Sequence, residues 1–462
     1  MEQLIERGRR ERIVLVGVAS GTTTLDDAEE SLDELALLID TAGADEVGRL
    51  LQRRDTPDPA TYLGTGKVAE LKELSEFTDC DTVVFDDELT PAQSRNLERL
   101  LGRTAIDRTA VILDIFDSHA RSAEAKAQVE LALLRYRLPR LRGKTTGLAQ
   151  QSGGIGTRTR GKGETQLEVD RRRLTQRIHR LEADLRHQGS VRATQRKARL
   201  ATELPRVAIV GYTNAGKSTL LNALTNAGVV AEDRLFATVD PTTRKLQLPG
   251  GESILLSDTV GFVRKLPHQL VKAFRTTLDE VIHADLLIHV VDGSGANPAA
   301  NVTAVREVLS ELGADNVAEM LVVNKADRGP AAAEFAARSP GAVLVSAHTG
   351  LGLDALVREL AVRVRANSRH VELLVPFDRG EVLAALFRSG KVSHQEPGPD
   401  GIKVAALLDL ASIRRWSSFV VSGADDLLGQ SPGEDTGDPA RTIVSATASA
   451  TDADLVAPLP GE

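Results

Sequence analysis

Hydrophobic and polar positions along the first 120 residues follow two alternating patterns. Short, continuous apolar runs rich in β-branched residues predict buried strands at 12–19 (RIVLVGVA), 81–85 (DTVVF) and 111–115 (VILDI). Segments with apolar positions at helical spacing predict helices at 25–42, 66–77 and 91–101. Thr90 as a cap and Pro91 in the first turn mark the start of the third helix. This alternation predicts a small α/β domain with a parallel sheet.

The next part of the chain has the pattern of two helices. A helical segment at 122–138 ends at Pro139, and a second one runs from 164 to 200. The second segment has a heptad-like apolar seam at Leu167, Leu174, Ile178, Leu181 and Leu185. The loop between them includes five glycines and three basic residues within 150–163. We therefore expect a long antiparallel helical hairpin with this Gly-rich loop at its tip.

A third unit begins at Pro205, with buried strands that end in short Gly- and Asp-containing motifs, and it closes with a helix at 353–366. Strands at 370–377 and 402–409, around a helix at 380–390, then predict a small α/β appendage. The expected fold class is α/β: a mostly parallel sheet flanked by helices, preceded by an α/β domain with its hairpin and followed by the appendage. The predicted domains are 1–119, 120–203 (hairpin), 204–368, 369–422 and a disordered acidic tail, 423–462.

Composition changes this picture little but excludes some classes of protein. With 42% hydrophobic and 26% charged residues, the chain is typical of a globular protein. Cys80 is the only cysteine, so a disulfide within the chain is excluded and a reducing compartment is favoured. No apolar run approaches the roughly 18 residues that span a bilayer. We expect a monomeric cytoplasmic protein that associates with a membrane peripherally at most.

The charge is unevenly distributed. The net charge is −8, yet residues 135–199 hold 18 Lys or Arg and only 5 Asp or Glu. The tail from Asp425 on has 8 acidic residues and one Arg, which favours disorder. A one-signed basic segment in an acidic chain predicts a polyanionic partner for the hairpin. The alternative is a solvated helical surface without a partner.

Candidate chemistry begins at 206–226 (RVAIVGYTNAGKSTLLNALTN), which has the pattern of strand, Gly-rich loop and helix. Its core is G-x-x-x-x-G-K-S, with Gly211, Gly216, Lys217 and Ser218 at the defining positions. Backbone N–H groups of such a loop wrap phosphates, the lysine reaches the outer phosphates, and the serine hydroxyl ligates magnesium. The helix that follows points its positive end at the same anion. This pattern predicts a P-loop.

Three further motifs favour GTP over ATP. D-x-x-G at Asp258–Gly261 offers a carboxylate near the magnesium and an N–H group for the γ-phosphate. N-K-x-D ends in Asp327, whose carboxylate accepts from both the N1–H and the 2-amino group of guanine, a pair of donors that adenine lacks. Asn324 is expected to fix the loop and Lys325 to lie over the base. Ser346, Ala347 and His348 form a third loop, where a backbone N–H meets guanine O6. Their order at strand ends makes coincidence implausible.

The segment 234–248 between the P-loop and D-x-x-G is the place of a first switch loop. Thr238, Thr242 and Thr243 are all candidates to complete the magnesium shell. Phe262 follows D-x-x-G where many GTPases have a water-orienting glutamine. We therefore expect slow intrinsic hydrolysis that another element or a partner completes, and no catalytic residue is assigned. His268 and the switch loop are candidates, with nothing to single them out.

The chain resembles the HflX family of ribosome-associated GTPases from about residue 12 to the end of the GTPase unit. The matching segments include YLGTGKVAEL (62–71), FDDELTPAQSRNLE (85–98), QVELALLRYRLPRL (128–141), QSGGIGTR (151–158), GETQLE (163–168) and GYTNAGKST with FATVDPTTR. The resemblance implies GTP binding by five segments: Gly211, Tyr212, Thr213, Asn214, Ala215, Gly216, Lys217 and Ser218; Phe236, Ala237, Thr238, Val239 and Asp240; Asp258, Thr259, Val260 and Gly261; Asn324, Lys325, Ala326 and Asp327; Ser346, Ala347 and His348. It implies Mg²⁺ on Ser218 and Thr238.

The resemblance also implies a partner, the large ribosomal subunit with its rRNA, which stimulates GTP hydrolysis. Ribosome splitting or rescue is the implied role, and the hairpin tip is the part expected to reach toward the peptidyl transferase region. The chain departs from the family pattern at Lys162, usually proline, and at Ala125, usually glycine. Two alternatives stay open: a GTPase acting on rRNA in ribosome biogenesis, and a GTP-gated regulator of a protein partner.

Overall fold

A computed structural model describes most of the chain, namely residues 10–21, 23–141, 160–199, 204–225, 235–236, 238, 242–249, 251–265, 280–366, 368–389, 391–409, 412–413 and 416–422. Side chains are described in these ranges except at 160–167, 190–199, 368, 370, 388–389, 391, 409 and 422. The tip loop 142–159 and the predicted tail 423–462 lie outside the described residues. No described helix is both long and apolar enough to cross a membrane.

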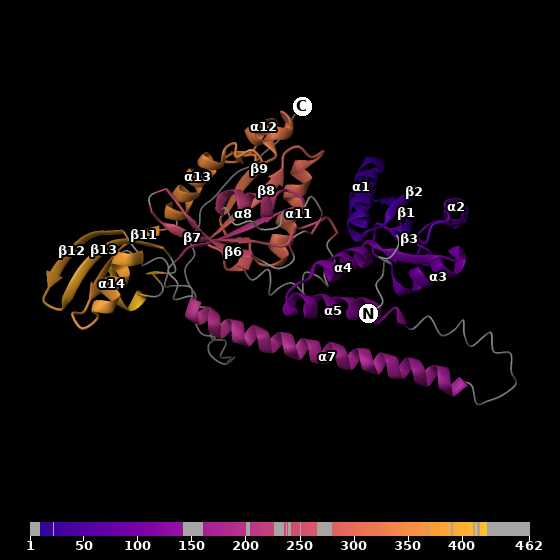
Figure 1. The fold of residues 1–462 in the computed structure, drawn as a ribbon, viewed down its shortest axis with the longest axis horizontal. Coiled ribbons are helices and arrows are strands. Elements are labelled where there is room, and N and C mark those ends of the chain that lie inside the picture. Colours follow the sequence, from indigo (N-terminus) through magenta and orange to yellow (C-terminus); the bar gives the residue numbers. More distant parts are fainter. Residues whose placement is uncertain are drawn as a thin grey trace, which may run out of the picture.

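The N-terminal part folds around a four-stranded parallel sheet with the order β2-β1-β3-β4 (Figure 1). Its strands are β1 Arg12–Ser20, β2 Asp45–Arg54, β3 Thr82–Phe85 and β4 Thr104–Asp107. Its helices are α1 Leu25–Ala42, α2 Thr65–Phe77, α3 Pro91–Leu101 and α4 Arg108–His119. The strand order reverses between β1 and β3. At such a point, the carboxyl edge of an α/β sheet normally holds a ligand.

Local sequence explains where these helices begin and end. Thr90 accepts from the backbone N–H of Gln93, and the Gln93 side chain accepts from the Thr90 N–H, which is a capping box. Thr24 and Asp27 form the same box at the start of α1. Gly102 ends α3 in the left-handed conformation, with φ 67°. The helices predicted at 25–42, 66–77 and 91–101 are therefore confirmed within a residue.

The strand predicted at 111–115 is wrong, because these residues lie in α4. Every residue from Arg108 to Phe116 is buried, so the segment shows none of the periodicity that separates a helix from a buried strand. The missed signal was Asp107, which accepts from the Ala110 N–H as the helix cap. The strand at this place is β4, which ends at Asp107 and directly precedes the helix.

Helices α5 (Ala123–Arg137) and α7 (Arg160–Arg199) pack against each other and run antiparallel (Figure 1). Ile178 and Leu181 are buried against α5, with Leu174 and Leu185 partly buried beside them. The predicted seam is therefore confirmed over the part of α7 with described side chains, which excludes Leu167. Ion pairs at 2.7 Å flank the seam, Arg135–Glu182 and Arg177–Glu130. Lys162 lies in the first turn of α7, whose start precedes the predicted position by four residues.

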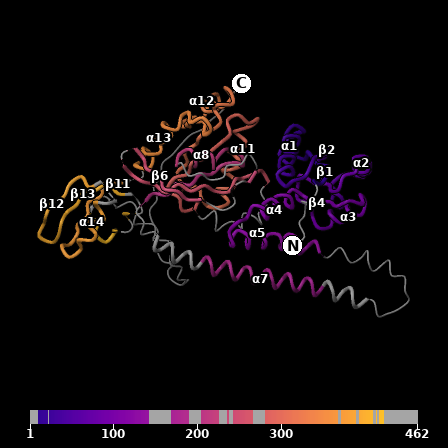
Figure 2. Tube along the Cα trace, in the orientation of Figure 1, coloured from indigo at the N-terminus to yellow at the C-terminus, as the bar shows by residue number. Residues whose placement is uncertain are grey.

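Among the described residues the central sheet, whose strand β6 is labelled in Figure 2, has six strands in the order β10-β9-β8-β5-β7-β6. All of them are parallel except β6. Its strands are β5 Arg206–Gly211, β6 Thr242–Gln247, β7 Ser253–Asp258, β8 Leu286–Asp292, β9 Glu319–Asn324 and β10 Val343–Leu344. The accompanying helical segments are α8 Lys217–Thr225, α11 Pro298–Glu311, η2 Ala326–Arg328, α12 Ala331–Arg338 and α13 Leu353–Ala366. The motifs predicted at strand ends follow β5, β7, β9 and β10 directly.

The C-terminal part is an antiparallel sheet with the order β12-β13-β11-β14 and one longer helix. Its elements are β11 Ser368–Val375, α14 Gly380–Ser389, β12 Lys391–Gly398, β13 Gly401–Asp409, η3 Ser417–Phe419 and β14 Val420–Ser422. The pattern predicted β11, α14 and β13. It missed β12 because that strand, KVSHQEPG, is mostly polar and exposed.

Candidate nucleotide-binding site

The loop from Gly211 to Gly216 connects β5 to α8 at the carboxyl edge of the central sheet. A Cβ atom on Gly211 would lie 2.2 Å from the carbonyl oxygen of Val290, and φ at Gly211 is 151°. A Cβ on Gly216 would lie 2.3 Å from Asn324 Nδ2, with φ at 92°. Glycine is required at both positions because the backbone approaches its neighbours closely with positive φ. The loop thus has the form that the P-loop pattern predicts.

Lys217 is buried at the start of α8, and its Nζ donates to the carbonyl oxygen of Tyr212 at 2.8 Å. Burial lowers the pKa of this amine to about 8, against the opposing effect of the Asp258 charge. The amine therefore lies inside the loop that the sequence assigns to the phosphates, in surroundings that favour a nearby anion.

Three oxygen side chains meet next to this loop, as a magnesium site requires. Ser218 Oγ donates to Asp258 Oδ2 at 2.6 Å and lies 2.7 Å from Thr238 Oγ1. Asp258 is fully buried, its Oδ1 has no hydrogen-bond partner among the described residues, and burial raises its pKa. Hard oxygen donors around an unpaired buried carboxylate atom fit Mg²⁺. Among the three candidate threonines, Thr238 is the one beside Ser218, whereas Thr243 Oγ1 contacts Ser257 Oγ at 2.8 Å on β7.

The N-K-x-D and S-A-H loops lie together and are joined to the P-loop. Asn324 Nδ2 donates to the carbonyl oxygen of Ala215 at 2.8 Å, and its Oδ1 accepts from the Ala347 N–H at 2.9 Å. The asparagine thus connects all three loops. Asp327 is exposed, and Ser346 Oγ donates to its Oδ1 at 2.5 Å, which lowers its pKa. An ionised, exposed carboxylate held in this way suits a pair of N–H donors on a base.

Asp292, at the end of β8, contacts the N-K-x-D loop of the candidate site, a contact that the motifs did not reveal. Its Oδ2 lies 2.7 Å from Lys325 Nζ, and the Ser294 side chain and backbone N–H donate to its Oδ1. Lys325 has φ at 63°, an uncommon conformation for a lysine, and the ion pair holds its side chain in place. The available signal was position alone: Asp292 ends the one central strand that lies between two motif-bearing strands, β5 and β9.

The D-x-x-G segment lies directly on the P-loop. Phe262 donates from its N–H to the carbonyl oxygen of Gly211 at 3.1 Å and accepts from the Thr213 N–H at 2.7 Å. A Cβ on Gly261 would lie 2.7 Å from Thr213 Cγ2 and 2.9 Å from Lys217 Nζ. The Phe262 side chain is 2% exposed and belongs to an apolar cluster, so it has no means to orient water. Within D-x-x-G, Thr259 Oγ1 donates to the carbonyl oxygen of Ile209 at 2.7 Å.

Some residues implied by the resemblance lie away from the site or outside the described chain. Phe236 is buried with φ at 57°, and its ring packs against Phe116 of α4 with centroids 4.6 Å apart. The side chain of His348, the last residue of the S-A-H motif, is exposed. Four residues named from the sequence lie outside the described residues: Ala237, Val239, Asp240 and His268.

Three sequence families match successive parts of the chain. Residues 29–117 match the family described as "GTP-binding GTPase N-terminal", and residues 119–199 match "GTP-binding GTPase Middle Region". Residues 206–325 match "50S ribosome-binding GTPase".

Curated relatives match over most of their length. A protein named "GTPase HflX" from Lacrimispora saccharolytica is 46% identical, with 88% of this chain and 96% of the relative covered. A "GTPase HflX" from Escherichia coli is 41% identical, with 82% and 89% covered. Among solved structures, a Sulfolobus solfataricus GTP-binding protein in complex with GDP is 24% identical, covers 76% of this chain and 98% of its own, and has a TM-score of 0.39.

Proposed function

The chain belongs to the HflX family of GTPases, which bind and hydrolyse GTP, and on this basis we propose a GTP-switched factor that binds the large ribosomal subunit and splits or rescues ribosomes. The observation that carries the ribosomal part is the match of residues 206–325 to GTPases described as binding the 50S ribosome. The basic hairpin supports it, because such a surface fits the phosphates of rRNA.

The nucleotide is held by the segments that surround the P-loop. The loop from Gly211 to Ser218 wraps the phosphates, with Lys217 on the outer ones. Asp327 accepts the guanine donors, and a backbone N–H of the segment from Ser346 to His348 meets guanine O6. Ser218 and Thr238 ligate Mg²⁺, with Asp258 beside them. When bound, the ion neutralises charge on the β- and γ-phosphate oxygens. The meeting of these loops, fixed by Asn324, supports the assignment.

Hydrolysis by the chain alone is slow in this proposal. The residue after D-x-x-G is Phe262, which is buried and carries no polar side-chain atom to orient the attacking water. The large ribosomal subunit then stimulates hydrolysis by completing the site or by placing the chain's own elements. If GTP is hydrolysed mainly on the ribosome, the factor stays bound until it has acted there, and hydrolysis then releases it.

The exposed arginines of α7 form the surface proposed for rRNA. Arg171, Arg172, Arg180 and Arg186 are all exposed, and they lie along the middle of the helix. The seam with α5 occupies another part of the helix surface, at Leu174, Ile178, Leu181 and Leu185. Phosphate contacts through such side chains carry most of the affinity for nucleic acid and weaken with salt.

We predict that replacing these four arginines with glutamine separates ribosome binding from GTP binding. Removing one phosphate-binding charge lowers the slope of log affinity against log salt by roughly 0.7–0.9, so the quadruple variant has a slope smaller by roughly two to four units. GTP affinity stays unchanged because the arginines are not part of the nucleotide site. Equilibrium binding to purified large subunits across a salt series measures both the affinity and the slope.

A matched control replaces four exposed arginines elsewhere with glutamine: Arg338, Arg358, Arg369 and Arg379. The control removes the same charge and leaves the slope for the large subunit unchanged. An equal decrease of slope in both variants contradicts the assignment to α7 and indicates a nonspecific charge effect. An unchanged slope in both contradicts a hairpin contact with rRNA phosphates.

A further inference from the structure

The nucleotide-binding part of the chain shares a buried interface with the N-terminal sheet domain. Phe236, from the segment between the P-loop and D-x-x-G, packs against Phe116 of α4. Tyr212 of the P-loop and Phe262 after D-x-x-G belong to the same apolar cluster as Ile112 and Phe116. Each of the three segments expected around the phosphates therefore contacts the N-terminal domain.

A group of acidic side chains lies at the carboxyl edge of the N-terminal sheet. Glu30 and Glu34 come from α1, and Asp86 and Asp87 directly follow β3. We call these four residues the acidic edge. Arg108, 2% exposed, pairs with Glu34 and, at 2.9 Å, with Asp86. One arginine against four carboxylates leaves an excess of negative charge at the point where the strand order reverses, which is where such sheets bind ligands.

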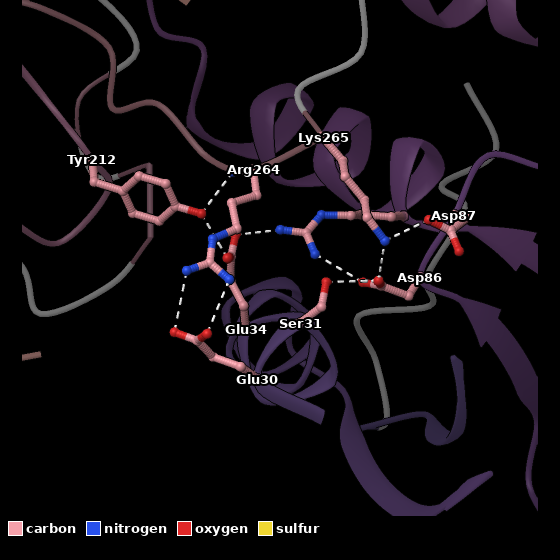
Figure 3. A network of polar contacts seen from close by, with 9 residues as sticks. Glu30, Ser31, Glu34, Asp86, Asp87, Tyr212, Arg264 and Lys265 are labelled. Carbon is pink, nitrogen blue, oxygen red and sulfur yellow. Dashed lines mark hydrogen bonds and ion pairs between the residues drawn. The ribbon is translucent and has the colours of Figure 1, made fainter. Parts of the chain in front are cut away.

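Two basic residues of the central domain fill this edge (Figure 3). Arg264 donates through both terminal nitrogens to Glu30 at 3.2 Å. Lys265 Nζ donates to Asp86 Oδ2 at 2.5 Å and also to Asp87. Burial alone lowers the pKa of Lys265, but the charges of Asp86 and Asp87 outweigh burial and raise it. This basic pair begins three residues after Gly261.

Tyr212 ties the P-loop to the same contact. Its hydroxyl donates to Glu34 Oε2 at 2.6 Å and accepts from the Arg264 N–H at 2.6 Å (Figure 3). Together with the backbone bonds of Phe262 to Gly211 and Thr213, this hydroxyl holds the D-x-x-G segment against the P-loop. The position of Gly261 beside Lys217 Nζ is thus fixed from both sides.

We propose that the acidic edge is a receptor for the basic pair Arg264–Lys265, and that docking of the pair opposes binding of the γ-phosphate while leaving GDP binding unaffected. The γ-phosphate lies between the Lys217 amine and the Gly261 N–H in the site assigned above. In the docked structure a Cβ on Gly261 would lie 2.9 Å from the Lys217 amine, which donates to the Tyr212 carbonyl oxygen instead of to a phosphate. Admitting the phosphate requires the segment from Gly261 onward to move, and the basic pair moves with it.

The consequence is reciprocal: the γ-phosphate weakens the contact between the two domains by the same factor by which the contact weakens γ-phosphate binding. GTP therefore loosens the N-terminal domain, and GDP lets it dock again. The inference rests on the nucleotide site of the proposed function but not on the ribosome. It is tested with the full chain alone.

The test compares affinities for GDP and for a non-hydrolysable GTP analogue in two variants that break the contact from opposite sides. One is Arg264→Gln with Lys265→Gln, and the other is Glu30→Gln with Asp87→Asn. In both, the analogue binds roughly tenfold tighter while GDP affinity changes by less than about twofold. Combining all four substitutions has less than the summed effect, because both pairs weaken the same contact, of which the acidic variant leaves only Lys265 on Asp86. In the unmodified chain, raising the salt from about 0.05 M to about 0.5 M screens the same ion pairs. The affinity for the analogue relative to that for GDP therefore increases, as in the variants.

The control is Asp33→Asn with Arg49→Gln. It removes a 2.8 Å ion pair within the N-terminal domain, between α1 and β2, and not one between the domains. It leaves both affinities unchanged. The proposal is overturned if both interface variants, with unchanged unfolding temperatures, bind the analogue no tighter than the unmodified chain does, or if GDP and analogue affinities change together. If an interface variant fails to fold, the salt series decides in the same way. Failure of the unmodified chain to bind either nucleotide contradicts the nucleotide site itself, which is a different outcome.

Discussion

Replacing Lys217 with alanine is expected to reduce the affinity for both GTP and GDP by at least about a hundredfold. The amine is the buried cation of the P-loop, and each hydrogen bond from a charged group contributes about 1.5–3 kcal/mol. Two such bonds to phosphate oxygens correspond to a decrease of about two to four orders of magnitude in affinity. Isothermal titration with GDP and with a GTP analogue measures the decrease directly.

The Lys217→Ala chain should remain folded, because the amine is costly to bury when no phosphate is present. Its unfolding temperature without nucleotide is expected to equal or exceed that of the unmodified chain, whereas stabilisation by added GDP disappears. Lys245→Ala, at an exposed lysine of β6, is the matched control and leaves nucleotide affinity unchanged. An affinity of the Lys217 variant within about tenfold of the unmodified chain contradicts its assignment to the phosphates.

Asp327→Asn is expected to weaken guanine nucleotides by at least about a hundredfold and to create affinity for xanthosine nucleotides. The asparagine amide keeps one acceptor for N1–H but places a donor against the 2-amino group of guanine, which leaves a polar pair unsatisfied. Xanthine has a carbonyl oxygen at that position, so the same amide donates to it. Titration with GTP and xanthosine triphosphate tests both halves of the prediction.

The gain of xanthosine binding separates this result from a loss of structure. Asp327 is exposed, so its substitution leaves folding intact. Asp354→Asn, at an exposed aspartate of α13, removes an equal charge and keeps the preference for guanine. Unchanged selectivity for GTP in the Asp327 variant means that another residue reads the base.

The sequence predicted most of the residues that the structure brings together in the candidate site, because the expected chemistry depends on local patterns. Gly211 and Gly216 are glycines for steric reasons that any P-loop shares, and Asn324 and Asp327 follow a strand that the apolar pattern marks clearly. Thr238 was one of three candidates by pattern. Thr238 lies 20 residues after Ser218 in the sequence, and only the folded chain shows that the two side chains are in contact.

Other features depend on contacts that no local pattern encodes. The helix α4 is buried on every side, which removes the periodicity that distinguishes it from a strand. The sequence did not predict the edge strand β2, because its charged and apolar residues alternate only weakly. Arg264 and Lys265 are two charges in a chain with 26% charged residues, and their acidic partners lie about 180–230 positions earlier. Only the assembled fold brings them together.

Sedimentation with purified ribosomal subunits decides whether this chain is a GTP-switched factor of the large subunit. The full chain is mixed with large or small subunits in the presence of GDP, GTP or a non-hydrolysable GTP analogue, and the pelleted chain is quantified. We expect co-sedimentation with the large subunit, strongest with the analogue and weakest with GDP, and little with the small subunit. Absence of the chain from the large-subunit pellet in every nucleotide state contradicts the proposed function.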